Sequence, residues 1–428
     1  MHRLGSPTYV DECAGLISAT KDDKKPLLGV GLGRSYGDSV LNPDGALIQT
    51  TKLDRFIAFD PSTGILRAEA GLSLWDVIEF AGVRGYFLPT TPGARYVTLG
   101  GAVANDVHGK NHHGAGTFGR HVKRIGLIRS DGEELTLSQD ENVDMFAATI
   151  GGLGLTGLII WVEFVLVPVP SLQIDQETIA FQSLEEFFVL ARESETSFEH
   201  TVAWIDCAAQ GQKLGRGIFS RGNWSKEGGA KISERKAIVR MPFPAPGFVL
   251  NKWSVGAFNE AYFSLNQRRA GRSVVSYDTF FYPLDAIGAW NLMYGAKGFY
   301  QYQSVVPPQD ALETTRRMLE VISKSGQGSF LAVLKTFGDV PSPGMLSFPS
   351  EGTTLALDFP NRGEKTLNLL GKLDEIVTEA GGRLYPAKDG RMPPSLFWQG
   401  FPKADAFTEY VDPGFSSSFW QRMIQERT

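Results

Sequence analysis

Residues 29–38 have the sequence GVGLGRSYGD and lie at the end of a short apolar segment, PLLGV at 26–30, that predicts a β-strand. Two more glycine-rich segments follow, one from 92 to 111 and one, GGLGLTG, at 151–157. Glycine-rich turns allow successive backbone N–H groups to converge on an anion without interference from Cβ atoms. Each segment alone is typical of an ordinary turn, but three in one region predict a long, bent, polyanionic ligand such as a dinucleotide.

The first segment does not match the dinucleotide-binding fingerprint of a Rossmann fold. That fingerprint requires G-x-G-x-x-G at the start of a helix, and no helix is expected directly after GVGLGRSYGD. A helix is instead expected at 73–84, where Ser73 precedes Asp76 by three residues and the two can form a capping box. A hairpin is expected at 122–137, with its turn at Asp131-Gly132. The region up to residue 170 is therefore interpreted as a ligand-binding domain of another fold.

The composition is that of a globular protein. The chain has 428 residues, of which 42% are hydrophobic and 21% charged, and a formal net charge of −5; two or three domains are expected, and a nucleic-acid partner is not. Cys13 and Cys207 are too few for a zinc ribbon, and four of the six histidines lie between 108 and 121 with no cysteine nearby, so no metal is predicted. No signal peptide or transmembrane segment is apparent, which favours a cytoplasmic location or one peripheral on the inner membrane.

From Ser171 onward the pattern changes to strands that alternate with amphipathic helices. This order predicts a split ferredoxin-like arrangement, an antiparallel sheet with its helices on one face. The expected strands are 172–181, 201–206, 300–306, 329–336, 353–359 and 383–387, and the expected helices are a helix capped by Ser183 and the segments 308–323 and 365–380.

One segment differs from the rest of the chain in charge. Between Lys213 and Arg272 there are 12 lysines and arginines, three glutamates and no aspartate, a net charge of +9. A solvated basic surface is one interpretation, and an interfacial patch for anionic lipid is a second. Nucleic acid is a third, which nothing else in the chain supports. The aromatic residues interleaved with these charges are Trp224, Phe243, Phe248, Trp253 and Phe258.

The glycine-rich segments, together with NDVHGKNHH at 105–113, resemble the FAD domain of the vanillyl-alcohol oxidase / p-cresol methylhydroxylase flavoproteins. Within that family the resemblance is strongest to the decaprenylphosphoryl-β-D-ribose 2-oxidase branch. It implies an α+β fold: a two-lobed FAD-binding domain, made of 1–170 and a C-terminal segment 389–428, encloses an antiparallel-sheet substrate domain at 171–388. The resemblance continues through FFYPLDAIGAWN (280–291), GFYQYQ (298–303), FLAVLKTFG (330–338), LALDFP (355–360) and RLYPAKD (383–389).

The resemblance implies FAD as the cofactor. In the covalent members of the family a histidine on the first glycine-rich loop holds the flavin ring, and Arg34 stands at that position here, so non-covalent FAD is expected. The implied FAD-binding residues are Gly31, Gly33, Arg34, Ser35, Tyr36, Gly93, Thr98, Gly100, Gly101, Asn105, His108, Gly109, Gly154 and Gly157.

The resemblance also implies a reaction site in front of the flavin ring. Strand alternation supports part of it, because Gln301 and Gln303 share one face of their strand. Lys388 is the first candidate for the general base and His108 the second, while Lys335 is a candidate for stabilising negative charge. The implied substrate-binding residues are Lys110, Trp204, Phe281, Gln301, Gln303, Lys335, Thr354 and Ala356.

The implied activity is oxidation of the 2-hydroxyl of a polyprenylphosphoryl-β-D-ribofuranose to a 2-keto intermediate, on the way to an arabinose donor for envelope polysaccharide. The implied partners are an NADH-dependent keto-reductase and membrane lipid. Ala356, Thr354 and Val202 stand where the branch has cysteine, asparagine and serine, which leaves the exact sugar open. The alternatives are a soluble aldonolactone or alditol oxidase of the same family, a non-catalytic binding module, and a metal-dependent hydrolase.

Overall fold

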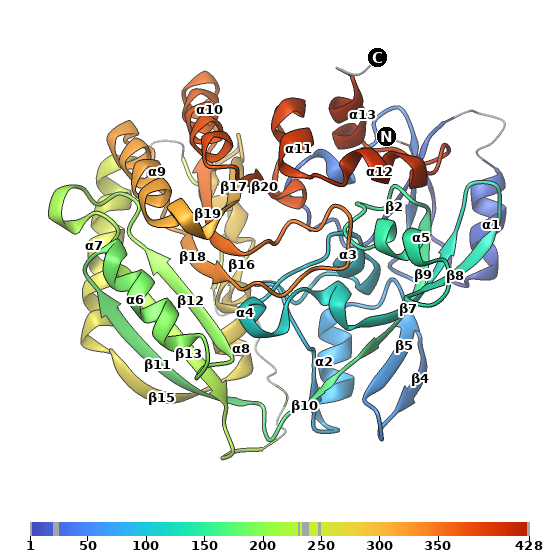
Figure 1. Ribbon diagram of the computed structural model, residues 1–428, viewed down its shortest axis with the longest axis horizontal. Coiled ribbons are helices and arrows are strands. Elements are labelled where there is room, and N and C mark those ends of the chain that lie inside the picture. The colour runs from blue at the N-terminus through green and yellow to red at the C-terminus, as the bar shows by residue number, and fades with distance from the viewer. Residues whose placement is uncertain (1, 20–24, 230–231, 233–238, 247–249, 426–428) are drawn as a thin grey trace.

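The computed structural model describes residues 2–19, 25–229, 232, 239–246 and 250–425. These residues form two lobes (Figure 1). The first lobe holds a five-stranded antiparallel sheet in the order β4-β5-β9-β7-β8 and a three-stranded parallel sheet in the order β1-β3-β2. The strands are β1 (His2–Gly5), β2 (Leu27–Val30), β3 (Ala46–Gln49), β4 (Phe56–Asp60), β5 (Ile65–Glu69), β7 (Val122–Ile128), β8 (Glu134–Ser138) and β9 (Leu158–Val165), with the short pair β6 (Tyr86–Phe87) and β10 (Val167–Pro168) beside them.

Local sequence signals account for the helices of this lobe. The capping box at Ser73 is confirmed: the Ser73 hydroxyl accepts from the backbone N–H of Asp76 at 3.2 Å, and α2 (Leu74–Gly82) begins there. The expected hairpin is formed by β7 and β8, and Gly132 has the positive φ of 98° that its turn requires. The other helices of the lobe are α1 (Asp11–Ser18), α3 (Leu99–Ala104), α4 (His112–Ala115) and α5 (Val143–Thr149).

The second lobe is built on an eight-stranded antiparallel sheet in the order β15-β11-β13-β12-β18-β19-β17-β20. Its strands are β11 (Gln173–Phe181), β12 (His200–Ile205), β13 (Gly217–Trp224), β15 (Gly271–Ser276), β17 (Phe299–Val306), β18 (Ala332–Phe337), β19 (Gly352–Pro360) and β20 (Arg383–Leu384). The α+β class and the antiparallel sheet are thus confirmed. The last strand is shorter than expected, because Pro386 has no N–H to donate and begins a 3₁₀ turn, Pro386–Lys388.

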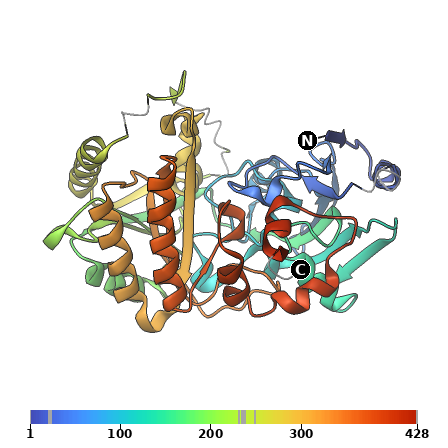
Figure 2. The same cartoon turned by 90° about the horizontal axis from the view of Figure 1, so that it is seen from above.

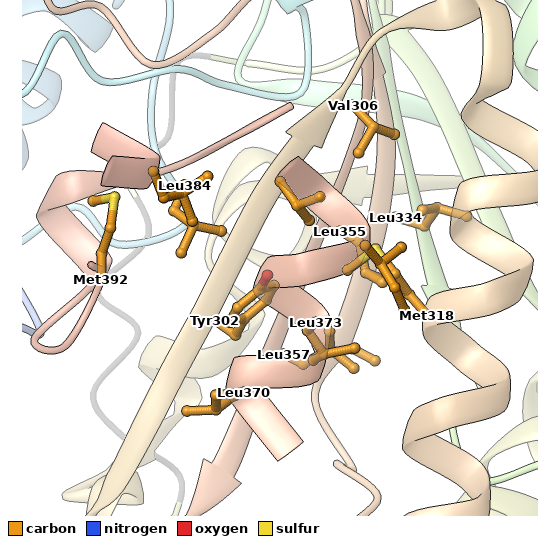
Figure 3. Packing of buried hydrophobic residues seen from close by; sticks show 14 of the residues in the cluster. Tyr302, Val306, Met318, Leu334, Leu355, Leu357, Leu370, Leu373, Leu384 and Met392 are labelled. Carbon is orange, nitrogen blue, oxygen red and sulfur yellow. The ribbon is translucent and has the colours of Figure 1, made fainter. Parts of the chain in front are cut away.

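Three of the described helices cover one face of this sheet, while the other face carries the site and, over β11 and β13, α7 (Lys252–Arg268). Figure 2 shows α9 (Ala311–Ser325) and α10 (Glu364–Glu379) side by side along the sheet, and α6 (Leu184–Ser194) packs into the same core. Tyr302 and Leu355 point from the strands toward Met318 of α9 and Leu373 of α10 (Figure 3). Because successive strand residues point to opposite faces, the neighbours of these core residues point away from the helices.

The C-terminal segment carries α11 (Pro394–Gly400), α12 (Ala404–Phe407) and α13 (Ser418–Ile424). Part of it reaches the first lobe, where the backbone N–H of Leu27 donates to Gly414 O at 2.7 Å and Arg422 pairs with Asp38 at 2.8 Å. Its aromatic side chains also pack into the core of the second lobe. The division into 1–170, 171–388 and 389–428 stays a prediction.

The basic segment is less open than its charge count suggests. Arg216 forms a buried ion pair with Asp206 at 2.7 Å, Arg221 pairs with Glu177 at 2.7 Å, and Trp224 packs against buried aromatic rings. The exposed part is centred on α7 (Lys252–Arg268), beyond the short pair β14 (Val239–Arg240) and β16 (Ile287–Gly288). Lys231, Arg235, Lys236 and Phe248 lie outside the described residues. None of the described helices is long and apolar enough to cross a membrane.

Candidate active site

A cavity of about 1320 Å³ lies between the glycine-rich segments of the first lobe and the face of the eight-stranded sheet that is turned away from α9 and α10. The first, second and third glycine-rich segments all contribute to its wall, as do β12, β13, β17, β18 and β19. A cavity of this size exceeds the range of about 300–1,000 Å³ usual for drug-sized ligands. It therefore has room for a dinucleotide and a second molecule.

The space around the glycines of the cavity wall indicates whether this wall suits a bound cofactor. A Cβ atom at Gly33, Gly93 or Gly154 would meet no atom of the described residues within 4 Å. Gly33 and Gly154 have positive φ values of 62° and 74°, which by themselves favour glycine. Gly93 has no such backbone reason, and its backbone on the cavity wall is open to the close approach of a bound molecule.

The loop after β2 offers hydrogen-bond donors to the cavity. The backbone N–H groups of residues 32–35 have no acceptor in the described part of the chain, although these residues line the cavity wall. Ser39, which sequence analysis missed, is 4% exposed, and its hydroxyl also lacks a partner among the described residues. Free donors around open space fit the phosphates of FAD. Arg34 lies on this loop and donates from Nε to Tyr96 O at 3.2 Å.

Two glycines of the second glycine-rich segment have N–H groups that are already paired within the chain. The N–H of Gly100 donates to Ala70 O at 2.8 Å, and the N–H of Gly101 donates to the hydroxyl of Thr98 at 3.2 Å. At Gly31 a Cβ atom would lie 2.2 Å from Thr98 Oγ1, so glycine there allows the first two glycine-rich segments to touch. The predicted FAD-binding residues named above lie on this wall, Gly157 and Asn105 included.

His108 and Lys335 meet on the opposite side of the cavity. Lys335 Nζ lies 3.2 Å from His108 Nδ1 and donates to Gly109 O at 3.2 Å, while Gln303 Nε2 lies 3.1 Å from His108 Nε2. Burial, followed by the charge of Lys388, lowers the pKa of Lys335 to about 7. Burial also holds the pKa of His108 well below its usual value, and Lys335 adds to this effect, so the imidazole is neutral near pH 7.

Lys388 lies where the 3₁₀ turn after β20 meets the first glycine-rich segment. Its Nζ is 4.0 Å from the centre of the Tyr36 ring, and burial lowers its pKa to about 8. Burial raises the pKa of the neighbouring carboxyl group, Asp358, to about 7. Asp358 is fully buried and accepts from Gln301 Nε2 at 2.6 Å. Sequence analysis missed Asp358, whose only signal was a carboxylate inside the apolar strand LALDFP.

The remaining predicted substrate residues differ in how they reach the cavity. Lys110 lines the wall and donates to Phe280 O, and burial followed by the charge of Lys335 lowers its pKa to about 7. Trp204, Phe281 and Ala356 also line the wall. Thr354 is 1% exposed and is not part of the wall, and its hydroxyl lies 3.2 Å from Gln303 Nε2, so its role in substrate binding stays a prediction.

The arrangement gathers basic groups in a largely desolvated space. Lys110, Lys335 and Lys388 line one cavity, and the fully buried carboxyl group of Asp358 interacts electrostatically with Lys388. Such a site attracts anions and can hold an amine partly unprotonated near neutral pH. Within the described residues, no group of three or more histidine, cysteine or acidic side chains is placed to hold a metal ion.

Comparison with known proteins identifies the class. Residues 4–138 match the family described as FAD binding domain, which contains the first two glycine-rich segments. With the open glycine cradle beside the lysine wall, this match defines the chain as an FAD-dependent oxidoreductase.

The particular family follows from a match over the whole chain. The chain is 34% identical over 424 residues to decaprenylphosphoryl-β-D-ribose oxidase of Mycolicibacterium smegmatis, which covers 95% of this chain and 91% of that protein. It belongs to the family of that oxidase. The sugar-lactone oxidases are more distant: D-arabinono-1,4-lactone oxidase of Yarrowia lipolytica is 24% identical over 42% of this chain and 34% of its own length, and L-gulonolactone oxidase of Mus musculus is 29% identical over 38% and 36%.

Proposed function

We propose that this oxidoreductase oxidises the 2-hydroxyl group of a polyprenylphosphoryl-β-D-ribofuranose to a ketone. The observation that carries the proposal is the lysine and glutamine wall of Lys335, Lys388, Gln301 and Gln303, which faces the glycine cradle across one cavity. Its positive charge suits a sugar phosphate, and its amide groups suit sugar hydroxyls. The similarity to the mycobacterial ribose oxidase over nearly the whole chain supports the same substrate class.

In this proposal the chain's own residues orient the sugar and move its proton. FAD, when bound, supplies a two-electron acceptor for the hydride of the C2–H bond. Lys388 accepts the proton of the 2-hydroxyl group, for which its lowered pKa of about 8 provides an unprotonated fraction near neutral pH. Lys110 and Lys335 face the phosphate. Arg34 stands in place of a tethering histidine, so the FAD is held without a covalent bond.

The same proposal gives the lipid end of the substrate a place at the cavity mouth. Tyr262 of α7 lines the cavity, and Phe258, one turn earlier in the same helix, is 48% exposed. We propose that α7 and its basic flanks contact anionic membrane lipid, where the polyprenyl tail resides. A 2-keto product still needs reduction to become an arabinose unit, which calls for an NADH-dependent keto-reductase as partner.

Anaerobic mixing of the yellow protein with candidate sugars tests the substrate. A short-chain polyprenylphosphoryl-ribose is expected to bleach the flavin absorbance, since both the phosphate and the 2-hydroxyl find partners in the cavity. Free alditols and aldonolactones are expected to leave it unchanged. Bleaching by the free sugars alone would support the soluble alditol or aldonolactone oxidase instead.

Vesicle binding tests the membrane contact. The protein is expected to sediment with vesicles that contain phosphatidylglycerol at low salt and to be released at high salt, because screening weakens the attraction of basic side chains. Trp253→Ala removes the most exposed aromatic group of α7, 84% exposed, and is expected to reduce binding. Ile57→Ala, at a residue 49% exposed on β4, is the matched control. Equal binding by the two variants, or none at low salt, would eliminate the α7 contact.

A further inference from the structure

The imidazole of His108 lies between two side-chain groups that both normally donate hydrogen bonds. The amide nitrogen of Gln303 lies 3.1 Å from Nε2, and the amine of Lys335 lies 3.2 Å from Nδ1. A neutral imidazole has one acceptor nitrogen and one N–H. It cannot accept from an amide and from an ammonium group at the same time, so one of the two partners has to change its role.

Two complete hydrogen-bond arrangements satisfy this requirement. In the first, the Gln303 amide donates to His108 Nε2, and His108 Nδ1–H donates to an unprotonated Lys335, which still donates to Gly109 O. In the second, the Gln303 amide is reversed, so that Nε2–H donates to its carbonyl oxygen and Nδ1 accepts from a protonated Lys335. The first arrangement requires an unprotonated Lys335, so only the reversed amide allows this lysine to carry a proton while it bonds to His108.

Thr354 extends this chain of groups through Gln303, and it is also the cross-strand partner of Lys335 in the pairing of β18 with β19. Its hydroxyl is 3.2 Å from Gln303 Nε2, and Gln303 is its side-chain hydrogen-bond partner among the described residues. Thr354 and Gln303 are 1% and 7% exposed, so water does not readily replace either group. A hydroxyl both donates and accepts, which allows Thr354 to serve the amide in either orientation.

We propose that Gln303 and Thr354 are positioning residues that determine, through His108, whether Lys335 carries a proton. The proposal rests on the chain's own hydrogen bonds and holds whichever sugar is oxidised. It goes beyond the assignment of Lys335 to charge stabilisation, because it makes the charge of this lysine adjustable.

This hydrogen-bond chain matters for the protonation of Lys335 because of the charged groups that surround the amine. The titratable groups that face it are all basic, namely His108, Lys110, His112 and Lys388. No carboxylate of the described residues forms an ion pair with Lys335, and the centre of the Phe337 ring lies 5.5 Å from its Nζ. The desolvated amine therefore depends on hydrogen bonds to hold a proton.

The pH dependence of Lys335 carbamylation by cyanate tests the proposal in the FAD-loaded protein. Cyanate reacts with the unprotonated amine, so the extent of labelling at each pH, read by peptide mass spectrometry, reports the protonation of Lys335 without reference to turnover. In Thr354→Val the first arrangement leaves a buried amide N–H without an acceptor, whereas in the second the carbonyl keeps its bond from His108. Unpaired buried N–H groups are the less tolerated of the two. The midpoint pH of the Lys335 labelling curve is thus expected to move upward by about half to one pH unit.

Thr354→Ser keeps the hydroxyl and is expected to keep the midpoint of the unmodified protein. Thr354→Ala loses the hydroxyl without the bulk of valine, and it is expected to shift the midpoint as Thr354→Val does. Lys324, an exposed lysine paired with Glu320 and not part of the cavity wall, serves as the internal reference. An unchanged Lys335 midpoint in the valine and alanine variants, or the same shift in the serine variant, would overturn the proposal.

Discussion

Lys388→Ala is expected to abolish reduction of the bound flavin by substrate while leaving the protein yellow. Removing a general base costs about 10²–10⁴-fold in rate, and the lowered pKa of Lys388, about 8, leaves part of its amine unprotonated near neutral pH. The unprotonated amine is the active form, so in the unmodified protein the reduction rate should rise with pH and level off above about pH 8. Stopped-flow absorbance under anaerobic conditions measures both effects.

The matched control for this variant is Lys324→Ala. Lys324 is an exposed lysine on α9, paired with Glu320 at 2.8 Å and remote from the cavity wall. Its removal is expected to leave the reduction rate and the pH profile unchanged. Near-normal reduction by Lys388→Ala would eliminate Lys388 as the base and transfer the role to His108 or Lys335.

Gly93→Val is expected to cost the protein its FAD. The added side chain would extend into the space that the cavity wall leaves open, where no described atom lies within 4 Å of a Cβ atom. Overlap with a bound group costs typically about 1–3 kcal/mol, and we expect the Kd for FAD to rise about 10- to 100-fold. Flavin content after purification and fluorescence titration of the apoprotein measure the loss.

Gly371→Val provides the comparison. Gly371 lies in α10, where a Cβ atom also meets nothing among the described residues within 4 Å, but it is not on the cavity wall. It is expected to retain full flavin content. If Gly93→Val bound FAD as tightly as Gly371→Val, the wall around Gly93 would not be the cofactor site.

Short-range signals explain why much of the fold could be predicted. The capping box at Ser73, the hairpin turn at Gly132 and the cap at Ser183 each depend on residues close together in the chain. Strand alternation likewise placed Gln301 and Gln303 on one face. The three glycine-rich segments predicted a polyanionic ligand, although not which of their N–H groups are free.

Long-range pairing explains what could not be predicted. Asp358 joins the site because β17 and β19 pair in a register that places it opposite Gln301, 57 positions away. Thr354 reaches Gln303 through the same pairing of β17 with β19, which places it opposite Val305. The charge count of 213–272 could not show that Arg216 is neutralised by buried Asp206. Such contacts depend on the tertiary fold, and no local pattern encodes them.

A crystal structure of the yellow protein, as purified, tests the central claim most directly. The account predicts one FAD in the cavity between the lobes, with its phosphates at the loop of residues 32–35, its ring on the side of Lys335 and Lys388, and no bond between the ring and any side chain. Flavin density at another place on the protein, or a covalent link from the ring to the chain, would contradict it.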